Sequence, residues 1–183
     1  MADFAGYSMP IQYSSITDEH LIVRKKVGVF DVSHMGEFIV KGKEALEFVQ
    51  YVSSNDASKL NVGDIQYTCY PNSDSGIVDD FLLYRMPDEN GSPVFMLVVN
   101  AGNKEKDWNW MEAHNNFDAQ MTDISDDIGL LAVQGPKATE ILQKLTDINL
   151  SECKYYTFKI GSIAGIDDAI ISTTGYTGSG GLS

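Results

Sequence analysis

Residues 76–85 read Gly76-Ile77-Val78-Asp79-Asp80-Phe81-Leu82-Leu83-Tyr84-Arg85. The β-branched and aromatic residues of this stretch favour a β-strand. Alternate side chains of a strand point to opposite faces. One face therefore carries Ile77, Asp79, Phe81 and Leu83. The other face carries Val78, Asp80, Leu82 and Tyr84. Each face is apolar apart from one carboxylate. The stretch therefore predicts a central strand that is covered on both sides.

Asp79 and Asp80 are adjacent acids inside this predicted strand. Removing an unpaired carboxylate from water is costly or shifts its pKa, so two such groups indicate a functional site. The alternative interpretation is a bulge or a strand end with both acids in water. Spacing alone leaves both interpretations open.

The composition limits the class of protein. A chain of 183 residues with 43% hydrophobic and 21% charged residues fits one globular domain or two small ones. The net charge of -13 argues against nucleic acid or an anionic membrane surface as a partner. No apolar run approaches the roughly 20 residues of a membrane helix, and no signal peptide opens the chain.

The cysteines and histidines give no metal-binding pattern. Cys69 and Cys153 are isolated, which fits a reducing compartment and excludes a disulfide framework. His20, His34 and His114 have no ligand spacing to one another or to the cysteines, so no metal site is predicted. We interpret His34 as a hydrogen-bonded structural residue.

Residues 37–124 are predicted to form a ferredoxin-like β-α-β-β-α-β unit. The expected strands cover 37–40, 76–85, 94–99 and 120–124, the helices cover 43–52 and 104–114, and a further short strand covers 65–70. Asp88-Glu89-Asn90-Gly91 predicts a hairpin with a type I′ turn between the two central strands.

The remaining residues are predicted to form a second, mixed α/β unit. Residues 1–14 are expected to be irregular, and a capping box at Ser15–Asp18 is expected to open a helix over 19–26. Strands are expected at 128–134, 155–160 and 169–174, with a helix that begins at Pro136. The predicted class is α+β, with the ferredoxin-like unit inserted in or packed on this second unit.

Seven short segments follow one another in a recognisable order. They are Asp3-Phe4-Ala5-Gly6-Tyr7-Ser8-Met9-Pro10, Val27-Gly28-Val29-Phe30-Asp31-Val32-Ser33-His34-Met35-Gly36-Glu37, Ser54-Asn55-Asp56, Gly76-Ile77-Val78-Asp79-Asp80, Val98-Val99-Asn100-Ala101, Gln134-Gly135-Pro136 and Gly175-Tyr176-Thr177-Gly178. Together they resemble the aminomethyltransferase, or T-protein, family of the glycine cleavage system. Each segment alone is a weak signal, but their shared order over essentially the whole chain is specific.

The resemblance implies a tetrahydrofolate-dependent enzyme. In this family a lipoyl arm on the small acidic H-protein carries an aminomethyl group, which N5 of tetrahydrofolate attacks. Ammonia leaves and 5,10-methylenetetrahydrofolate forms. The family's key carboxylate corresponds to Asp80, which would orient folate, stabilise the iminium charge or help to move a proton.

The resemblance also implies a pterin pocket. Tyr67, Tyr84 and Tyr176 would supply aromatic walls, Asn100 would supply amide hydrogen bonds, and Met35 and Tyr155 would line the pocket. Without the resemblance, the tyrosines would be interpreted as core residues with satisfied hydroxyl groups. With the resemblance, residues 1–36 and 125–183 are expected to form an incomplete first folate-binding unit, and residues 37–124 the ferredoxin-like unit.

The chain departs from the family pattern at its end. The family continues the Gly175–Gly178 motif with Gly-Phe-Glu, whose glutamate holds the pterin, whereas this chain reads Gly181-Leu182-Ser183. The family's second half and its downstream arginine have no counterpart here. We therefore expect a trimmed fragment that binds folate weakly and does not turn over.

Other functions stay open at this stage. One is a non-catalytic folate module, as in relatives that assist iron–sulfur cluster assembly, although their cysteine motif is missing. Another is the folate domain of a demethylase or oxidase, and a third is a purely structural role for the acids. The expected location is the bacterial cytoplasm, with the mitochondrial matrix as the alternative. The sequence does not set the oligomeric state.

Overall fold

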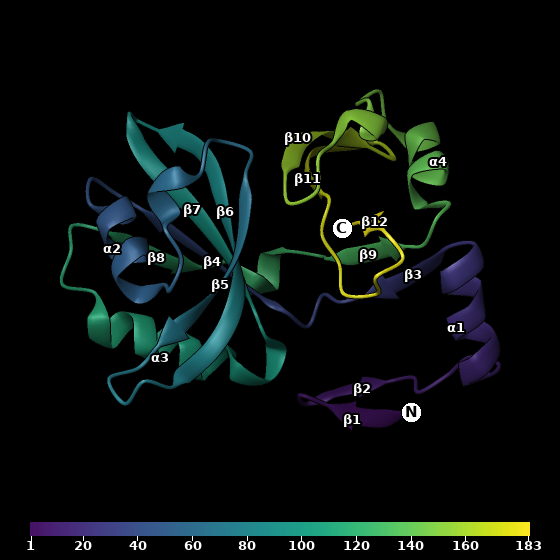
Figure 1. Cartoon of the computed structure of the whole chain (residues 1–183), viewed down its shortest axis with the longest axis horizontal. Coiled ribbons are helices and arrows are strands. Elements are labelled where there is room, and N and C mark those ends of the chain that lie inside the picture. The colour runs from purple at the N-terminus through teal and green to yellow at the C-terminus, as the bar shows by residue number, and fades with distance from the viewer. The chain divides into compact units, whose positions relative to one another are not determined.

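The computed structural model describes residues 1–183, which divide into two compact units (Figure 1). Ser33–Ile128 form one unit, here called the central unit. Met1–Val32 and Gly129–Ser183 form the other, here called the split unit because two separate segments build it. The observed boundaries lie a few residues outside the expected limits of 37–124.

The central unit is built on a five-stranded antiparallel sheet. Its strands are β4 (Gly36–Lys41), β5 (Ile65–Pro71), β6 (Ile77–Glu89), β7 (Ser92–Val99) and β8 (Gln120–Asp123). Their order is β5-β6-β7-β4-β8. β6 contains Ile77–Arg85 of the opening stretch and pairs with β5 on one side and, from Phe81, with β7 on the other, so its predicted central place in the sheet is confirmed.

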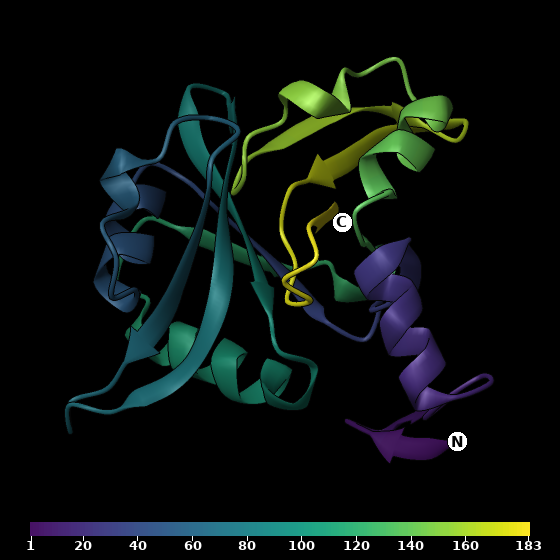
Figure 2. The ribbon, with the colours of Figure 1, turned by 45° about the vertical axis from the view of Figure 1, so that its right-hand side comes forward.

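Two helices cover one face of this sheet. They are α2 (Ala45–Val52) and α3 (Lys104–His114), and Figures 1 and 2 show both on the same side of the strands. Short 3₁₀ turns lie at Ala57–Lys59, Ala101–Asn103 and Ser125–Asp127. Phe48 of α2 and Met111 of α3 join Phe38 and Leu97 of the sheet in one buried core. Burial of this apolar surface is the main stabilising contribution of the unit.

The predicted alternation of side chains along β6 is confirmed. Phe81 and Leu83 lie opposite Val99 and Leu97, and all four side chains belong to the core beneath the helices. Asp80, Leu82 and Tyr84 therefore project from the other face of the sheet, because successive side chains alternate.

The hairpin between β6 and β7 forms at the predicted turn. Asn90 and Gly91 both have positive φ angles, 53° and 79°, as a type I′ turn requires. Glu89 pairs with Ser92 directly beside the turn, so β6 runs to Glu89 rather than ending at Arg85 as predicted. The sheet also has one strand more than the four-stranded unit predicted, because β5 pairs along β6.

The split unit contains three small sheets and two helices. The sheets pair β1 (Ala2–Phe4) with β2 (Tyr7–Met9), β10 (Phe158–Ile163) with β11 (Ile166–Ser172), and β9 (Leu131–Gln134) with β3 (Gly28–Asp31) and β12 (Gly181–Leu182). The helices are α1 (Ile16–Lys25) and α4 (Ala138–Leu142), with 3₁₀ turns at Gln143–Leu145 and Leu150–Glu152. Its buried core contains Val133, Ala138, Leu150, Ile171 and Leu182.

Several predictions for the split unit were wrong in detail. Residues 1–14 were expected to be irregular but include the β1–β2 hairpin, and β3 lies where the prediction placed a helix end and a connector. These strands have only three or four residues, too few to show a period. The predicted N-cap is confirmed, since Ser15 Oγ accepts a hydrogen bond from the N–H of Asp18 at 3.3 Å.

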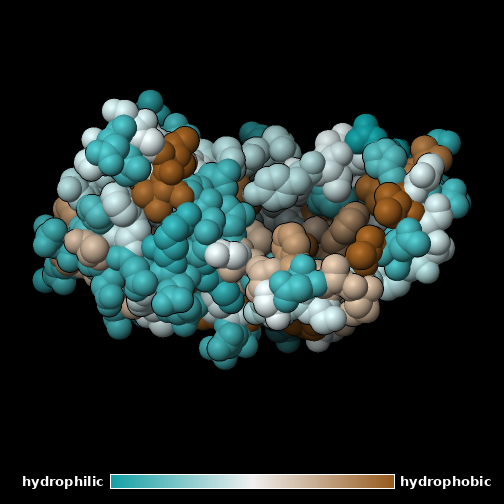
Figure 3. Space-filling view, turned by 90° about the horizontal axis from the view of Figure 1, so that it is seen from below, coloured by the Kyte–Doolittle hydropathy of each residue, from teal (hydrophilic) through white to brown (hydrophobic).

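Apolar side chains also reach the surface of the protein. The brown patches of Figure 3 lie among hydrophilic residues on the face that it shows. In the split unit, α1 has no buried residue, although it carries Leu21 and Ile22. No helix of the structure is both long enough and apolar enough to cross a membrane.

Replacing Leu97 tests the core of the central unit. Leu97 is 0% exposed, so Leu97→Ala should lower the free energy of unfolding by about 2–5 kcal/mol, through lost burial and the cavity left behind. Ile77 of the same sheet is 65% exposed. Ile77→Ala should therefore change the free energy of unfolding by no more than about 0.5 kcal/mol. Urea denaturation measures both, and equal losses would contradict this description of the core.

Candidate functional site

Asp80 is held by side chains from the two strands that flank it. Tyr67 of β5 donates its hydroxyl hydrogen bond to Asp80 Oδ2. Asn100, the residue after β7, donates from Nδ2 to Asp80 Oδ1 at 2.7 Å. The carboxylate is half-buried. Its two oxygens therefore have fixed directions while part of the group still faces outward.

The amide of Asn100 also reaches the neighbouring acid. Its Nδ2 lies 3.1 Å from the main-chain oxygen of Asp80 and 3.2 Å from Asp79 Oδ1. One amide nitrogen with two hydrogens thus serves acceptors on both acids. Asn100 in this way ties the end of β7 to the start of β6.

Asp79 points to the opposite face, as the alternation predicts, and is held there. Asn103 Nδ2 donates to Asp79 Oδ2 at 2.9 Å. Burial by itself would raise the pKa of Asp79, but hydrogen bonds, first from Asn103 and then from the N–H of Asp80, lower it below its ordinary value. Asp79 is therefore a carboxylate at neutral pH.

The arrangement decides between the two interpretations of the acid pair. Both acids lie within β6, and the register shift of β6 against β5 falls next to them, between Cys69 and Pro71 of β5. Each carboxylate accepts hydrogen bonds from side chains of neighbouring elements. The bulge of the alternative interpretation is therefore present, because Val78 and Asp79 together lie opposite Tyr70, but its acids in water are not, because both carboxylates are held by side chains.

Glu37 is a buried carboxyl group that the sequence analysis did not single out. It is 2% exposed, and neither carboxyl oxygen has a hydrogen-bond partner. Burial raises its pKa to about 7, against the opposing charge of Lys104. Glu37 pairs with Val98, and Val98 pairs with Leu82, so Glu37 lies on the same sheet face as Asp80. The alternation of side chains along the strand predicted at 37–40 could have placed Glu37 on one face of the sheet.

The central unit contains most of the predicted site residues. Tyr67 and Asn100 contact Asp80 directly. Tyr84 is 4% exposed and projects from the same sheet face as Asp80. Met35 immediately precedes β4 and is half-buried. Their roles toward a ligand stay predictions.

The other two predicted residues, Tyr155 and Tyr176, belong to the split unit. Their exposed fractions are 69% and 79%, so neither is a core residue. The ring of Tyr155 meets the ring of Tyr156 edge-on, with 4.6 Å between centroids. These positions make the core interpretation of both tyrosines wrong, and their roles toward folate stay predictions.

The segment around Tyr176 is held by the buried side chain of Gln134. Gln134 Nε2 donates to the main-chain oxygen of Thr174 at 3.1 Å, and Gln134 Oε1 accepts from Thr177 Oγ1 at 2.9 Å. Gly175, with φ of 149°, leaves the necessary space, since a Cβ there would lie 2.1 Å from Gln134 Oε1. The segments Gln134-Gly135-Pro136 and Gly175-Tyr176-Thr177-Gly178 therefore contact each other, and this contact holds the main chain on both sides of Tyr176.

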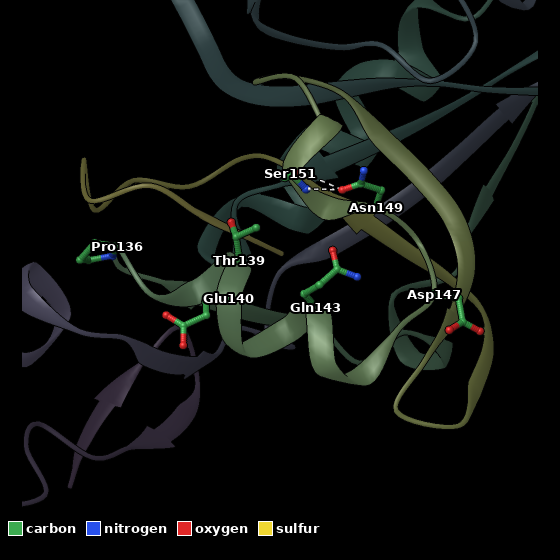
Figure 4. Close-up of a pocket in the computed structure, with 7 residues that line it drawn as sticks. All are labelled: Pro136, Thr139, Glu140, Gln143, Asp147, Asn149 and Ser151. Atoms are coloured by element: carbon green, nitrogen blue, oxygen red, sulfur yellow. Dashed lines mark hydrogen bonds between the residues drawn. The ribbon is translucent and has the colours of Figure 1, made fainter.

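An open hollow of about 620 Å³ also lies on the split unit (Figure 4). Its lining consists of Pro136, Thr139, Glu140, Gln143, Asp147, Asn149 and Ser151. Gln143 Nε2 donates to the main-chain oxygen of Ile148 at 3.0 Å, and the N–H of Leu150 donates to Gln143 Oε1 at 2.9 Å. These bonds brace the surrounding loop. None of the predicted site residues lines the hollow.

No group of three or more His, Cys, Asp or Glu side chains is placed to hold a metal ion. The chemistry available at Asp80 is that of an oriented carboxylate beside a phenol and an amide. Such a group can stabilise a developing positive charge or accept a proton.

Glu37 should make the stability of the protein fall as the pH rises. Its ordinary pKa is 4.5 and its pKa in the folded chain is about 7, so the folded state holds a proton that the unfolded state releases between these values. The wild type should lose up to about 1 kcal/mol of unfolding free energy per pH unit in this window relative to Glu37→Gln. Urea denaturation from pH 4.5 to pH 7 measures the difference. The exposed Glu105→Gln is the matched control, and equal pH slopes for all three proteins would refute the assignment.

The chain has clear relatives among known proteins. The model of the family described as "GCVT N-terminal domain" matches residues 1–182. The aminomethyltransferases of Porphyromonas gingivalis and Bacteroides fragilis are 62% and 60% identical to the chain over 182 residues. Each match covers 100% of this chain and 49% of the relative. The chain thus spans about half the length of the curated relatives it matches.

Solved structures give the same result. Glycine cleavage system aminomethyltransferase T from Bartonella henselae superposes with a TM-score of 0.87 at 34% identity, covering 99% of this chain and 48% of that chain. Heterotetrameric sarcosine oxidase from Corynebacterium sp. U-96 superposes with a TM-score of 0.58 at 15% identity, covering 87% of this chain and 77% of that chain. This similarity shows a shared fold alone. The expected mixed helix-and-strand class with several sheets is confirmed. The chain belongs to the GCVT N-terminal domain family.

Proposed function

We propose that this chain is the tetrahydrofolate-binding part of an aminomethyltransferase of glycine cleavage. The protein would accept the aminomethyl group from the lipoyl arm of H-protein and produce 5,10-methylenetetrahydrofolate and ammonia. The observation that carries the proposal is the carboxylate of Asp80, fixed by Tyr67 and Asn100 in a member of this family.

In this proposal Asp80 acts on the positive charge that develops as ammonia leaves. Its oxygens are already oriented by two donors, so little reorganisation accompanies the reaction. Preorganised groups of this kind contribute roughly 3–4 kcal/mol to transition-state stabilisation. Proton transfer by the same carboxylate is the second role that its position supports.

Asn100 is proposed to contact the pterin through its amide oxygen. Both hydrogens of its Nδ2 are directed at the acids of β6. Its Oδ1 accepts no hydrogen bond within the chain, so it is available to an N–H of the pterin ring. Tyr67, Tyr84 and Met35 are proposed to form the apolar wall, in keeping with the composition of ligand pockets.

Tyr155 and Tyr176 are proposed as the contribution of the split unit to folate binding. Their large exposed fractions and the brace that Gln134 provides near Tyr176 support this role. We further propose that β4, β6, β7 and β8 with α2 and α3 are a ferredoxin-like unit extended by β5. The split unit, predicted as 1–36 plus 125–183, would be the first folate-binding unit.

Lipoylated H-protein is the proposed partner. H-protein is acidic, and this chain carries a net charge of -13, so like charges would slow their encounter on this part of the enzyme. The relatives named above are bacterial, which supports the bacterial cytoplasm over the mitochondrial matrix as the proposed location.

Asp80→Asn tests the proposal directly. In an aminomethyltransferase of full length that carries this chain, the substitution should lower the release of ammonia and methylenetetrahydrofolate from aminomethylated H-protein by about 10²–10³-fold. Tetrahydrofolate affinity should change little, because the amide keeps the shape of the site. The exposed Asp74→Asn is the matched control and should keep full activity. The 183-residue chain alone should bind tetrahydrofolate weakly and show no turnover.

Two outcomes would contradict the proposal. If the full-length wild type binds tetrahydrofolate but never turns over, the chain is a non-catalytic folate module or uses another donor, as a demethylase or oxidase would. If Asp80→Asn keeps full turnover, Asp80 has no part in the chemistry.

A further inference from the structure

Residues 1–32 form four secondary-structure elements without a single buried residue. The segment contains β1, β2, α1 and β3, and it lies at the purple end of the colour scale in Figure 1. Ten of the twenty-one large hydrophobic side chains that are exposed belong to it, whereas the whole central unit has four. A local excess of exposed apolar side chains marks a surface on which another polypeptide or a ligand packs.

β3 contributes an apolar edge to this surface. In the sheet order β12-β9-β3 it is the edge strand, and it pairs with β9 alone. Val29 and Phe30 are consecutive, so they project from opposite faces of the strand, and they are 63% and 40% exposed. Both faces of this edge strand therefore carry exposed apolar side chains. Natural proteins usually cover or charge such an edge, because it readily accepts another segment of chain.

α1 is anchored to the split unit and yet leaves its apolar side chains uncovered. In its last turn, Arg24 Nη1 donates to the main-chain oxygen of Thr177 at 2.9 Å. Earlier in the helix, Ile16, Leu21 and Ile22 are 61%, 40% and 44% exposed. The helix is therefore held in place by its C-terminal end, and most of its surface is open to a further layer of structure.

The β1–β2 hairpin is a two-stranded sheet of its own. Phe4 of β1 pairs with Tyr7 of β2, and their side chains are 57% and 43% exposed. An isolated two-stranded hairpin is marginally stable in water at best, so it gains stability only by packing on something else. Within the 183 residues, no buried core forms beneath it.

The charge of residues 1–32 also differs from that of the rest of the chain. The segment contains four acids and three cationic side chains, so it is nearly neutral, although the chain carries a net charge of -13. A strong net charge keeps a surface in water and resists association. The nearly neutral, apolar segment is therefore the part of the chain that is best suited to lie inside an interface.

The relatives indicate what covers this surface. The aminomethyltransferase of Porphyromonas gingivalis matches 100% of this chain, but the match takes up only 49% of the relative. The structure from Bartonella henselae superposes on 99% of this chain with 48% of its own length. The same fold therefore occurs in chains about twice as long, and about half of each such chain lies outside the matched part.

We propose that residues 1–32 are the surface on which the other half of a full-length aminomethyltransferase chain packs. That half would cover β3, α1 and the β1–β2 hairpin, and the burial of their apolar side chains would hold the two halves together. The inference rests on the proposed function only in taking the chain as part of such an enzyme, and it needs neither tetrahydrofolate nor the chemistry at Asp80.

Thiol labelling of the full-length protein tests the inference. Ile22→Cys on α1 and Val29→Cys on β3 each place a thiol on the proposed surface, and Ile77→Cys, at a position of β6 that is 65% exposed, is the matched control. Mass spectrometry measures the reaction of each new thiol with N-ethylmaleimide, in the native protein and in urea. In the native protein the first two thiols should react at least about 10-fold more slowly than in urea, and the control within about 3-fold. In the 183-residue chain this protection should be lost.

Three outcomes would overturn the inference. One is that Ile22→Cys and Val29→Cys react as fast as Ile77→Cys in the native full-length protein. Another is equal protection of all three thiols, because the covered surface would then not be residues 1–32. The third is protection in the 183-residue chain that rises with its concentration and accompanies a dimer in analytical ultracentrifugation, which would assign the surface to a second copy.

The test is independent of the proposed chemistry. The expected protection in a full-length protein that neither binds nor uses tetrahydrofolate supports the packing surface, even though the proposed function then fails. Conversely, an active enzyme in which both thiols react freely overturns the packing surface and leaves the proposed function intact.

Discussion

The amide of Asn100 makes it possible for two adjacent acids to lie inside an interior strand. β6 pairs with β5 at Asp80 and with β7 from Phe81 onward, so the two acids lie where the pairing with β7 begins. Asn100 projects one nitrogen between them from the end of the neighbouring strand and contacts acceptors of both. Hydrogen bonds to charged groups are among the stronger ones in proteins, and here they offset the cost of placing the acids in the sheet.

The acids near this contact fall into two groups, those that accept hydrogen bonds and those that do not. Asp79 and Asp80 accept hydrogen bonds from amides or a phenol, and hydrogen bonds keep Asp79 ionised. Glu37 and Asp107 have no such donors, and burial raises their pKa values to about 7 and about 8. The number of donors, rather than burial alone, thus decides which acids carry charge. One oriented, half-exposed carboxylate, Asp80, is available for chemistry.

The parts of the fold that follow from local chemistry were predictable from the sequence. The Asn90-Gly91 turn, the alternation along β6 and the bounds of α3 were all predicted, because each depends on a residue type or a repeat within a few positions. The short strands β1 and β2 were missed because three residues each are too few to show a period, although they pair with each other. β3 was missed because its partner, β9, is distant in the sequence. β5 was expected to be a strand, but its pairing with β6 in the same sheet was not predicted.

The candidate site was predictable only in part. Asp80 followed from the strand pattern and from the resemblance, whereas Tyr155 and Tyr176 followed from the resemblance alone. Asp107 was missed, although it lies four positions before Met111 on the inward face of α3, a spacing that could have identified it. The raised pKa of Asp107 was not predictable from the sequence, because it depends on burial without donors in the folded structure.

A double-mutant cycle between Asn100→Ala and Asp80→Ala, read as the free energy of unfolding, tests this account most directly. A contact between an amide and a carboxylate predicts that the two effects are not additive, with a coupling energy of about 1–3 kcal/mol. Effects that add to within about 0.5 kcal/mol would show that Asn100 does not hold Asp80, and would contradict the account of the site.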